Sequence, residues 1–458
     1  MNELAAIVLA AGQGKRFRSP IPKVLHRAAG HPLIHYVLNA LKELEHLSRV
    51  VVVVGRDRNE VASAVLGIRP DAILVDQTEL LGTGDAVRRC RTELEEHHGA
   101  VIVVPGDAPL IRGSTLQSLA KRHAKTQAAV TLLTAQLDDP TGYGRIIKDS
   151  SGALVGIVEE ADLSPTEQGV DEVSSGIWCF EKVALFDALT KITNENAQGE
   201  YYLPDAALVI AGLGGDTYTM TAEDASEIMG VNDRAQLAAA DRELRKRYME
   251  VLAAAGVTIV DPNATYIDIG IEVGVDTTIH PMTFLEGSTR VGKGCSIGPS
   301  TRIIDSVVED EANVTFSVVR GAHIGPSATV GPYASLRPGT RLGPHAKAGT
   351  FVEIKGSVVG EGSKVPHLSY IGDAEIGRDV NLGAGTITGN YDSESKAKAT
   401  TRIEDGAFTG SDTVLVAPVR LGRGSGTGAG SVVTKDVEDG QIVVGVPAKP
   451  MRKRKMKG

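Results

Sequence analysis

A single carboxylate stands just beyond a segment expected to form a buried strand. Residues 101–104 are all aliphatic, and Gly106-Asp107 comes two positions later. Ligands of open α/β sheets bind at the carboxyl ends of the strands. Mg²⁺ prefers oxygen ligands and shares them with substrate phosphates. Asp107 is therefore a candidate Mg²⁺ ligand, and a turn or cap residue is the alternative for this position.

Two short segments rich in small residues could bind phosphate groups. LAAGQGKR at residues 9–16 ends one apolar run, and LGTG at residues 81–84 precedes a helical stretch. Small residues allow backbone N–H groups to approach phosphates where a helix starts. The first segment is not a dinucleotide fingerprint, because Phe17 replaces the third glycine, and its spacing does not fit a Walker loop. A structural turn is the alternative, and Lys23 adds a cation soon afterwards.

A second set of polar side chains lies in the C-terminal part of the chain. An isolated Arg, Lys or His on a surface is usually solvated. Here the set brackets one aperiodic segment, residues 388–401, which favours a shared site. Acyl transfer from a thioester to an amine needs a base, and imidazole, with an ordinary pKa of about 6.5, is suited to it. The set comprises Arg337, Lys355, His367, Tyr370, Asn381, Asn390, Tyr391 and Lys396.

Aliphatic residues recur every six positions in this C-terminal part. Ile279, Leu285, Val291, Ile297 and Ile303 follow this spacing. A short fixed period predicts a solenoid, because each unit buries its aliphatic residue only against the next turn. Six residues per face and three faces per coil describe a parallel β-helix of triangular section. The aperiodic segment predicts a loop on one of its faces.

The N-terminal half alternates predicted strands with predicted helices. This alternation is typical of an α/β domain with a largely parallel sheet, here residues 1–234. Residues 235–255 contain no Gly or Pro and predict one connecting helix, followed by the repeat domain at 256–458. The predicted strands are residues 5–10, 50–54, 72–75 and 101–104, and the predicted helices include residues 32–44 and 83–96.

Composition narrows the possible functions. The net charge of -9 over 458 residues argues against a general nucleic-acid binder. The three cysteines form no CxxC pair, so a disulfide framework or zinc knuckle is not expected. No apolar run reaches the ~18 residues of a membrane span, and the first residues lack the basic region of a signal peptide. These features predict a cytoplasmic protein.

The order of several motifs resembles one known family. LAAGQGKR is followed by PKVLH, LGTG, GDAP, DPTGYGRI, NAQGEYY and GVND. This series resembles the bifunctional N-acetylglucosamine-1-phosphate uridyltransferase/glucosamine-1-phosphate acetyltransferases, over essentially the whole chain. The resemblance implies an α/β protein with an N-terminal Rossmann-like nucleotidyltransferase domain, a connecting helix and a C-terminal left-handed parallel β-helix of hexapeptide repeats.

The resemblance also implies two reactions. Glucosamine-1-phosphate is acetylated with acetyl-CoA, and N-acetylglucosamine-1-phosphate then attacks the α-phosphorus of UTP with release of pyrophosphate. It implies Mg²⁺ as the metal, a homotrimer with acetyl-transfer sites between chains, and a place in cell-wall precursor synthesis. Two alternatives stay open: a single-activity sugar-phosphate nucleotidyltransferase with a structural β-helix, and a non-catalytic scaffold.

Roles for the N-terminal residues follow from the same resemblance. Arg16 and Lys23 stabilise phosphate charge, and Asp107 and Asn232 ligate Mg²⁺. Ser174 is a departure, because the family often has Asn at this sugar contact. The resemblance implies that Gln77, Gly82 and Thr83 contact the uracil and that Gly144 and Glu159 hold the N-acetyl sugar. The implied UDP-N-acetylglucosamine-binding residues are Leu9, Ala10, Ala11, Gly12, Lys23, Gln77, Gly82, Thr83, Gly144, Glu159, Ser174 and Asn232.

The C-terminal roles are implied in the same way. His367 is the base, expected on the repeat face that carries Lys355, and Arg337 with Lys355 binds the sugar phosphate. The sugar pocket is completed by Tyr370, Asn381, Asn390, Tyr391 and Lys396. Acetyl-CoA is bound by Ala384, Asn390, Tyr391, Ser411 and Ala429. The Arg that some relatives carry before Val446-Pro447 is replaced by Gly445.

Overall fold

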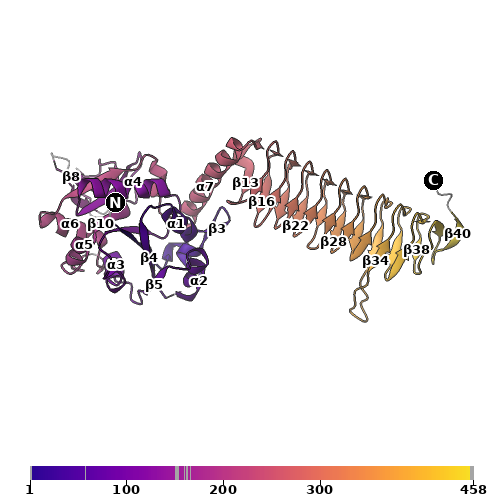
Figure 1. The fold of residues 1–458 in the computed structure, drawn as a ribbon, viewed down its shortest axis with the longest axis horizontal. Coiled ribbons are helices and arrows are strands. Elements are labelled where there is room, and N and C mark those ends of the chain that lie inside the picture. Colours follow the sequence, from indigo (N-terminus) through magenta and orange to yellow (C-terminus); the bar gives the residue numbers. More distant parts are fainter. Residues whose placement is uncertain are drawn as a thin grey trace. The chain divides into compact units, whose positions relative to one another are not determined.

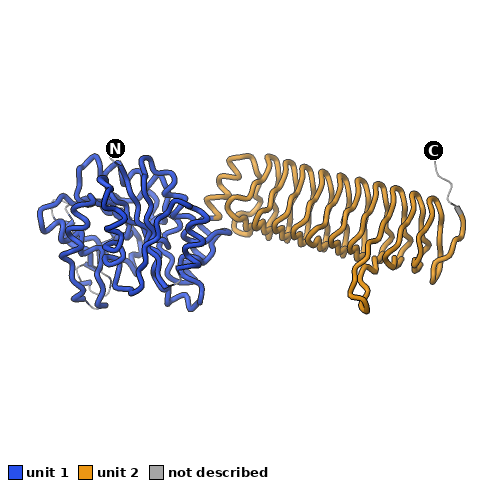
Figure 2. The backbone as a smooth tube through the Cα atoms, turned by 60° about the horizontal axis from the view of Figure 1, so that its bottom comes forward, with its two compact units in different colours: residues 1–244 blue, residues 245–458 orange. Residues whose placement is uncertain are grey.

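The computed structural model describes residues 3–56, 58–149, 154–158, 160, 163–165, 167–196 and 198–453. The chain divides into two compact units, residues 1–244 and residues 245–458 (Figure 2). The division falls within helix α7 (Arg234–Ala254), which is the helix predicted at residues 235–255. Domain boundaries at residues 234 and 255 stay a prediction. In the described part of the chain, no helix has the length and apolar character required to cross a membrane.

The first unit is built on one twisted sheet with the strand order β11-β7-β10-β6-β1-β4-β5 (Figure 1). β1 pairs in parallel with β4 and β6, whereas β10 runs antiparallel to both of its neighbours. The strands are β1 (Leu4–Ala10), β4 (Leu47–Val54), β5 (Ile73–Asp76), β6 (Ala100–Pro105), β7 (Val130–Gln136), β10 (Glu172–Glu181) and β11 (Thr217–Thr221), with β8 (Arg145–Lys148) and β9 (Leu154–Val158) attached through β10.

Helices cover both faces of this sheet. Alternate residues of β1 face opposite ways, so that Ala6 and Val8 pack with one group of helices and Ala5 and Ile7 with the other. Strands covered on both faces appear in the sequence as continuous apolar runs, which is why the four predicted strands could be recognised. One group is α1 (Leu33–Lys42), α2 (Arg58–Ile68) and α4 (Gly113–Thr126), and the other is α3 (Thr83–Arg88), α5 (Lys182–Leu189) and α6 (Leu203–Gly212).

The helix predicted at residues 83–96 is shorter than expected. α3 ends at Arg88, and the amides of Cys90 and Arg91 then bond to carbonyls only three residues back, at 3.0 and 3.2 Å. Cys90 and Leu94 are both fully buried against the sheet. Because residues 85–96 contain no Gly or Pro, their composition gave no sign of this change, and packing against the sheet overrides the local helical preference.

The second unit is a parallel β-helix whose coils carry strands on three faces (Figure 1). The first face holds β12 (Thr258–Ile259), β15 (Thr278–Ile279), β18 (Ser296–Ile297), β21 (Asn313–Val314), β24 (Thr329–Val330), β27 (Lys347–Thr350) and β30 (Lys364–His367). The second face holds β13 (Thr265–Ile267), β16 (Thr283–Glu286), β19 (Arg302–Ile304), β22 (Val318–Arg320), β25 (Ser335–Leu336), β28 (Glu353–Lys355), β31 (Tyr370–Gly372), β33 (Ile387–Gly389), β35 (Val414–Val416) and β38 (Val432–Val433). The third face holds β14 (Glu272–Val273), β17 (Arg290–Val291), β20 (Val307–Val308), β23 (His323–Ile324), β26 (Arg341–Leu342), β29 (Val358–Val359), β32 (Ala374–Ile376), β34 (Thr401–Ile403) and β36 (Val419–Leu421).

The six-residue period places one aliphatic side chain inside the coil on each face. Ile279 on the first face, Leu285 on the second and Val291 on the third are all buried, and each belongs to one continuous core that runs through the β-helix. The unit ends with β37 (Gly426–Thr427), β39 (Gln441–Val444) and β40 (Lys449–Lys453). The repeat predicted from sequence is thus confirmed, with three faces per coil.

The aperiodic segment leaves the coil, as the sequence predicted. The chain departs after β33 and returns at β34, and the intervening residues form a hairpin closed by a bridge between Tyr391 and Lys398. Figure 2 shows this hairpin projecting from the side of the stacked coils. Tyr391 and Lys396 are exposed on it, whereas Asn390 at its base is buried.

Candidate active sites

Strand register brings three loops of the first unit to the same edge of the sheet. β1 is paired so that Leu9 lies beside Val53 and Pro105, and the amide of Gly106 donates to the Leu9 carbonyl at 2.9 Å. The loops that follow β1, β4 and β6 therefore leave the sheet side by side. This is the carboxyl edge at which ligands of such sheets bind.

Three predicted residues from distant segments meet at this edge. The Lys23 ammonium contacts the Asp107 carboxylate and donates to Asn232 Oδ1 at 2.7 Å. The amide of Val231 bonds to the Asp107 carbonyl at 2.9 Å and fixes the segment that carries Asn232. The side chains of Lys23 and Asp107 are only 14% and 16% exposed. The Asp107 carboxylate and Asn232 Oδ1 thus both contact the same positive charge, that of Lys23. A site where two oxygens surround a cation fits the ligand preference of Mg²⁺.

Gln77, Gly82 and Thr83 also come together. Gln77 Nε2 donates to the Gly82 carbonyl at 3.0 Å, and Thr83 Oγ1 accepts from the Leu203 amide at 3.0 Å. Gly82 has a φ of 103°, and a Cβ there would lie 2.4 Å from the Tyr201 carbonyl oxygen. Glycine is therefore required at this turn, both for its conformation and for the space beside it.

Asp85 is a residue of this site that the sequence did not reveal. Its buried carboxylate accepts from Gln77 Nε2 at 3.0 Å and from Arg88 and Arg89 at 2.8 Å each. Burial acts to raise the pKa of Asp85, but the hydrogen bonds from Arg89, Gln77 and Arg88 outweigh it, so that the pKa lies below its usual value. In the sequence, Asp85 reads only as an acidic residue in the first turn of a helix.

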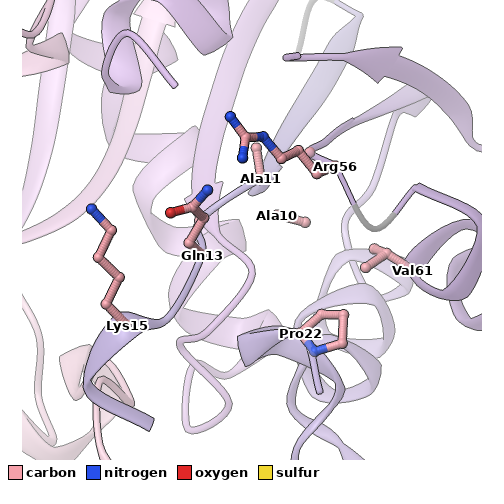
Figure 3. A pocket seen from close by; sticks show the side chains of 9 residues that line it. Ala10, Ala11, Gln13, Lys15, Pro22, Arg56 and Val61 are labelled. Carbon is pink, nitrogen blue, oxygen red and sulfur yellow. The ribbon is translucent and has the colours of Figure 1, made fainter. Parts of the chain in front are cut away.

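A cavity of about 280 Å³ opens beside the loop after β1. Figure 3 shows Gln13, Lys15 and Arg56 around it, with Ala10, Ala11, Pro22 and Val61 forming the rest of the labelled lining. Gly55 makes the close approach possible, since a Cβ there would lie 2.6 Å from the Ala11 carbonyl oxygen. Arg56 is a lining residue that the sequence did not reveal, although its place just beyond β4 is the same signal that pointed to Asp107.

The residues predicted to hold the sugar are partly brought together. The amide of Ser174 donates to the Gly144 carbonyl at 2.9 Å, so the two predicted sugar contacts are adjacent. The Arg145 guanidinium holds this loop by donating hydrogen bonds to the Pro140 carbonyl at 2.8 Å and to the Tyr143 carbonyl. Arg16 is exposed in the short turn after Gly14. Glu159 lies outside the described residues.

In the second unit, the predicted phosphate-binding cations are neighbours on the second face. Arg337 bonds through its amide to the Ile354 carbonyl at 2.8 Å, which places it beside Lys355, and Lys355 is paired in register with Gly372. The Arg337 guanidinium also forms an ion pair with Glu353 at 2.8 Å. That hydrogen bond raises the pKa of Arg337 above its usual value.

The side chains of Tyr370 and Asn390 lie beside Gly372, the residue that is paired with Lys355. A Cβ on Gly372 would be 2.6 Å from the Tyr370 hydroxyl and 2.8 Å from Asn390 Nδ2. Asn390 Nδ2 also donates to Asp373 Oδ2 at 2.5 Å, which fixes its amide. Two cations followed by a tyrosine hydroxyl and an amide form a polar strip suited to a sugar phosphate.

His367 lies on a different face from the one expected. It ends β30 on the first face, whereas Lys355 belongs to β28 on the second face. The reason is that the chain turns the corner at Leu368, whose φ is 52°, before β31 begins. The exposed imidazole has no hydrogen-bond partner among the residues that the structure describes.

Three of the five predicted acetyl-CoA residues follow His367 along that corner. The Gly385 amide bonds to the His367 carbonyl, the Asp412 amide to the Ala384 carbonyl and the Gly430 amide to the Ser411 carbonyl, at 3.3, 2.7 and 2.8 Å. Ala384, Ser411 and Ala429 therefore line one edge in successive coils. Asn381, by contrast, lies on the first face, bridged to Lys364, and Tyr391 and Lys396 lie on the hairpin.

These features define the class of the protein: a doubly wound nucleotide-binding unit joined to a parallel β-helix of hexapeptide repeats. A family model described as the MobA-like NTP transferase domain matches residues 6–173.

Three relatives show the family. "Bifunctional protein GlmU" of Heliobacterium modesticaldum is 48% identical over 444 residues, covering 97% of this chain and 96% of the relative. Proteins of the same name from Thermobifida fusca and Carboxydothermus hydrogenoformans are 48% and 46% identical, covering 96% of this chain and 91% and 97% of themselves. The chain belongs to the bifunctional GlmU family.

The space over Gly372 gives a test of the second-unit site. Gly372→Ala places a methyl group against the Tyr370 hydroxyl and Asn390 Nδ2, and we expect the KM for glucosamine-1-phosphate to rise about tenfold or more, as when one buried polar contact is lost. Gly389→Ala is the control, because its Cβ would meet nothing closer than 3.6 Å. Steady-state thiol release measures both variants. Equal KM values for the two variants would contradict this placement of the sugar.

Proposed function

We propose that the chain is a two-site enzyme of UDP-N-acetylglucosamine synthesis. The second unit acetylates glucosamine-1-phosphate with acetyl-CoA, and the first unit transfers UMP from UTP to N-acetylglucosamine-1-phosphate. The observation that carries the proposal is that each unit assembles its own polar cluster from distant segments of a chain that matches its relatives over nearly their whole length.

Uridylyl transfer at the carboxyl edge of the sheet needs positioning and charge neutralisation. A phosphate oxygen of the sugar phosphate forms a bond to the α-phosphorus of UTP while the bond to the β-phosphate bridging oxygen breaks, and pyrophosphate leaves. Lys23 and Arg16 stabilise the phosphate charge. Membership of the family supports a divalent metal, and we propose Mg²⁺ held by Asp107 and Asn232, which neutralises phosphate charge when bound. The Lys23 ammonium then bonds to phosphate oxygens in place of the Asp107 and Asn232 oxygens.

Replacement of Asp107 tests this assignment. Asp107→Ala removes a ligand and the counter-charge of Lys23, and we expect pyrophosphate release to fall by about 10²-fold or more, with thiol release unchanged. Asp76→Ala is the control, because Asp76 also stands at the end of a strand of this sheet but pairs with Arg58 and is 46% exposed. Mg²⁺-dependent pyrophosphate release that survives in Asp107→Ala would count against the role of Asp107.

Acetyl transfer at the corner of the β-helix needs a base and an anion site. The amine of glucosamine-1-phosphate attacks the thioester carbonyl, its proton passes to a base, the carbon–sulfur bond breaks, and the thiol of CoA leaves. His367 is the proposed base, because its imidazole is exposed and has no hydrogen-bond partner among the described residues. It also lies on the same corner as Ala384, Ser411 and Ala429, which follow it in successive coils. Arg337 and Lys355 bind the phosphate.

Loss of the imidazole should affect one reaction only. We expect His367→Asn to lower thiol release by ~10²–10⁴-fold, the usual contribution of a general base, and to leave pyrophosphate release and the unfolding midpoint near wild type. His345→Asn, at another exposed turn of the β-helix with a φ of 58°, is the matched control. A drop of only a few fold in His367→Asn would return this residue to a structural role.

The corner beside His367 also supports a homotrimer, which is part of the proposal. Exposed apolar side chains follow one another along it: the rings of Tyr333 and Phe351 are stacked with their centroids 5.4 Å apart, and those of Phe316 and Tyr333 are tilted and 5.7 Å apart. Contiguous exposed apolar surface marks an interface. The second-face strip and the first-face Asn381 are separated by this corner in one chain, so a second copy supplies the missing side of the site. The apolar ridge is Met282, Phe316, Tyr333, Phe351 and Leu368.

The association state can be measured directly. We expect light scattering to give three chains for the wild type, and the double substitution Tyr333→Ser with Phe351→Ser to shift the mass toward one chain and abolish thiol release but not pyrophosphate release. A monomeric wild type that releases thiol at full rate would overturn the shared site.

A further inference from the structure

The amide of Gln77 is held in one orientation by two acceptors. Its Nε2 donates to the Gly82 carbonyl and to Asp85 Oδ2, both at 3.0 Å. A carbonyl oxygen and an ionised carboxylate can only accept, so an amide turned the other way would place three acceptors together. The chemistry of the two partners therefore settles which end of the amide is the nitrogen.

This arrangement leaves only the Gln77 oxygen free to contact a ligand. Both hydrogens of Nε2 are used, and Oε1 has no donor among the described residues. Gln77 as a whole is only 3% exposed. Gln77 stands at the ligand-binding edge of the sheet, where its amide N–H bonds to the carbonyl of Val54, the last residue of β4, at 2.8 Å.

Asp85 is itself held by several contacts. It is 2% exposed, and its carboxylate is fixed from the far side by Arg88 on Oδ1 and by Arg89 on Oδ2, each at 2.8 Å. The two arginines lie three and four residues along the same helical segment, so the ion pairs are local. A buried, doubly paired carboxylate stays ionised and can hold Gln77 without moving.

We propose that Asp85 determines the base selectivity of the nucleotide site by forcing Gln77 to present an acceptor and no donor. The inference rests on the proposed function and on the contact of Gln77 with the uracil that the family resemblance implies. Uracil carries a hydrogen at N3, which Gln77 Oε1 can accept, whereas cytosine carries a lone pair at N3. Oε1 facing that lone pair would be a buried, unsatisfied contact, so CTP is rejected. Asp85 is a positioning residue, because it acts only through Gln77.

Without Asp85 the amide loses this restriction. The single bond to the Gly82 carbonyl uses one hydrogen of Nε2 and permits the side chain to turn, so that the other hydrogen can be offered to cytosine N3. The change should therefore appear as altered selectivity and not only as altered activity.

The test is the ratio of kcat/KM for UTP to that for CTP, measured as pyrophosphate release from one preparation, so that the fraction of active protein cancels. We expect the wild type to prefer UTP by about 10²-fold or more, and the near-isosteric Asp85→Leu to lower the ratio at least about tenfold. Asp85→Asn should keep most of the selectivity, because its one oxygen can still serve Gln77 and Arg89. Arg88→Gln is the matched control: it removes the ion pair on Oδ1 and the contact of the guanidinium with the Tyr201 ring at 4.7 Å, but it leaves both bonds to Oδ2, so the ratio should stay within about threefold.

An unchanged ratio in Asp85→Leu, or an equal fall in Arg88→Gln, would overturn the proposal. If Asp85→Leu does not fold, N3-methyl-UTP tests the same contact on the wild type: a loss of at least about tenfold in kcat/KM is expected, and equal use of UTP and N3-methyl-UTP would overturn it. Failure of the underlying function looks different, because folded wild type would then release no pyrophosphate with UTP or CTP.

Discussion

Parallel pairing in register is the constraint on which both clusters depend. In the first unit it sets Leu9 beside Pro105, and this brings Lys23, Asp107 and Asn232 within contact. In the second unit it stacks Lys355 on Gly372. A slip of one residue would turn every side chain of a strand to the opposite face, so the apolar interior of each unit also fixes the chemistry of its surface.

The second common feature is local positive charge on an acidic chain. The protein carries a net charge of -9, yet each cluster gathers cations where anionic phosphates are expected to bind. Lys23 neutralises Asp107 and donates a hydrogen bond to Asn232 in the first unit, and Arg337 is paired with Glu353 in the second. When a substrate phosphate displaces these internal partners, each cation exchanges one ion pair for another. Binding therefore does not leave a cation without a counter-charge. Asp85 extends the same principle to Gln77, whose orientation depends on a fixed carboxylate.

The sequence predicted what depends on short-range periodicity and missed what depends on packing between distant segments. The six-residue spacing predicted the β-helix, because one aliphatic residue is buried on each face of every coil. Apolar runs predicted the central strands of the sheet, because both sides of these strands are buried. Asp107 was found from its place beyond a strand. Three features could not be predicted from neighbouring residues, because each depends on contacts across the fold. They are the early end of α3, the corner that separates His367 from Lys355, and the hydrogen bond between Gln77 and Asp85.

The central claim is that the two reactions take place at separate sites, one formed by the first unit and one by the second, so that loss of one site leaves the other active. Its most direct test combines two single-site variants, one lacking Asp107 and one lacking His367, with glucosamine-1-phosphate, acetyl-CoA, UTP and Mg²⁺. Neither variant alone should form UDP-N-acetylglucosamine at a substantial rate, and an equimolar mixture should restore its formation to about half the wild-type rate, because each supplies the site that the other lacks. A mixture of folded variants that stays inactive would contradict the account.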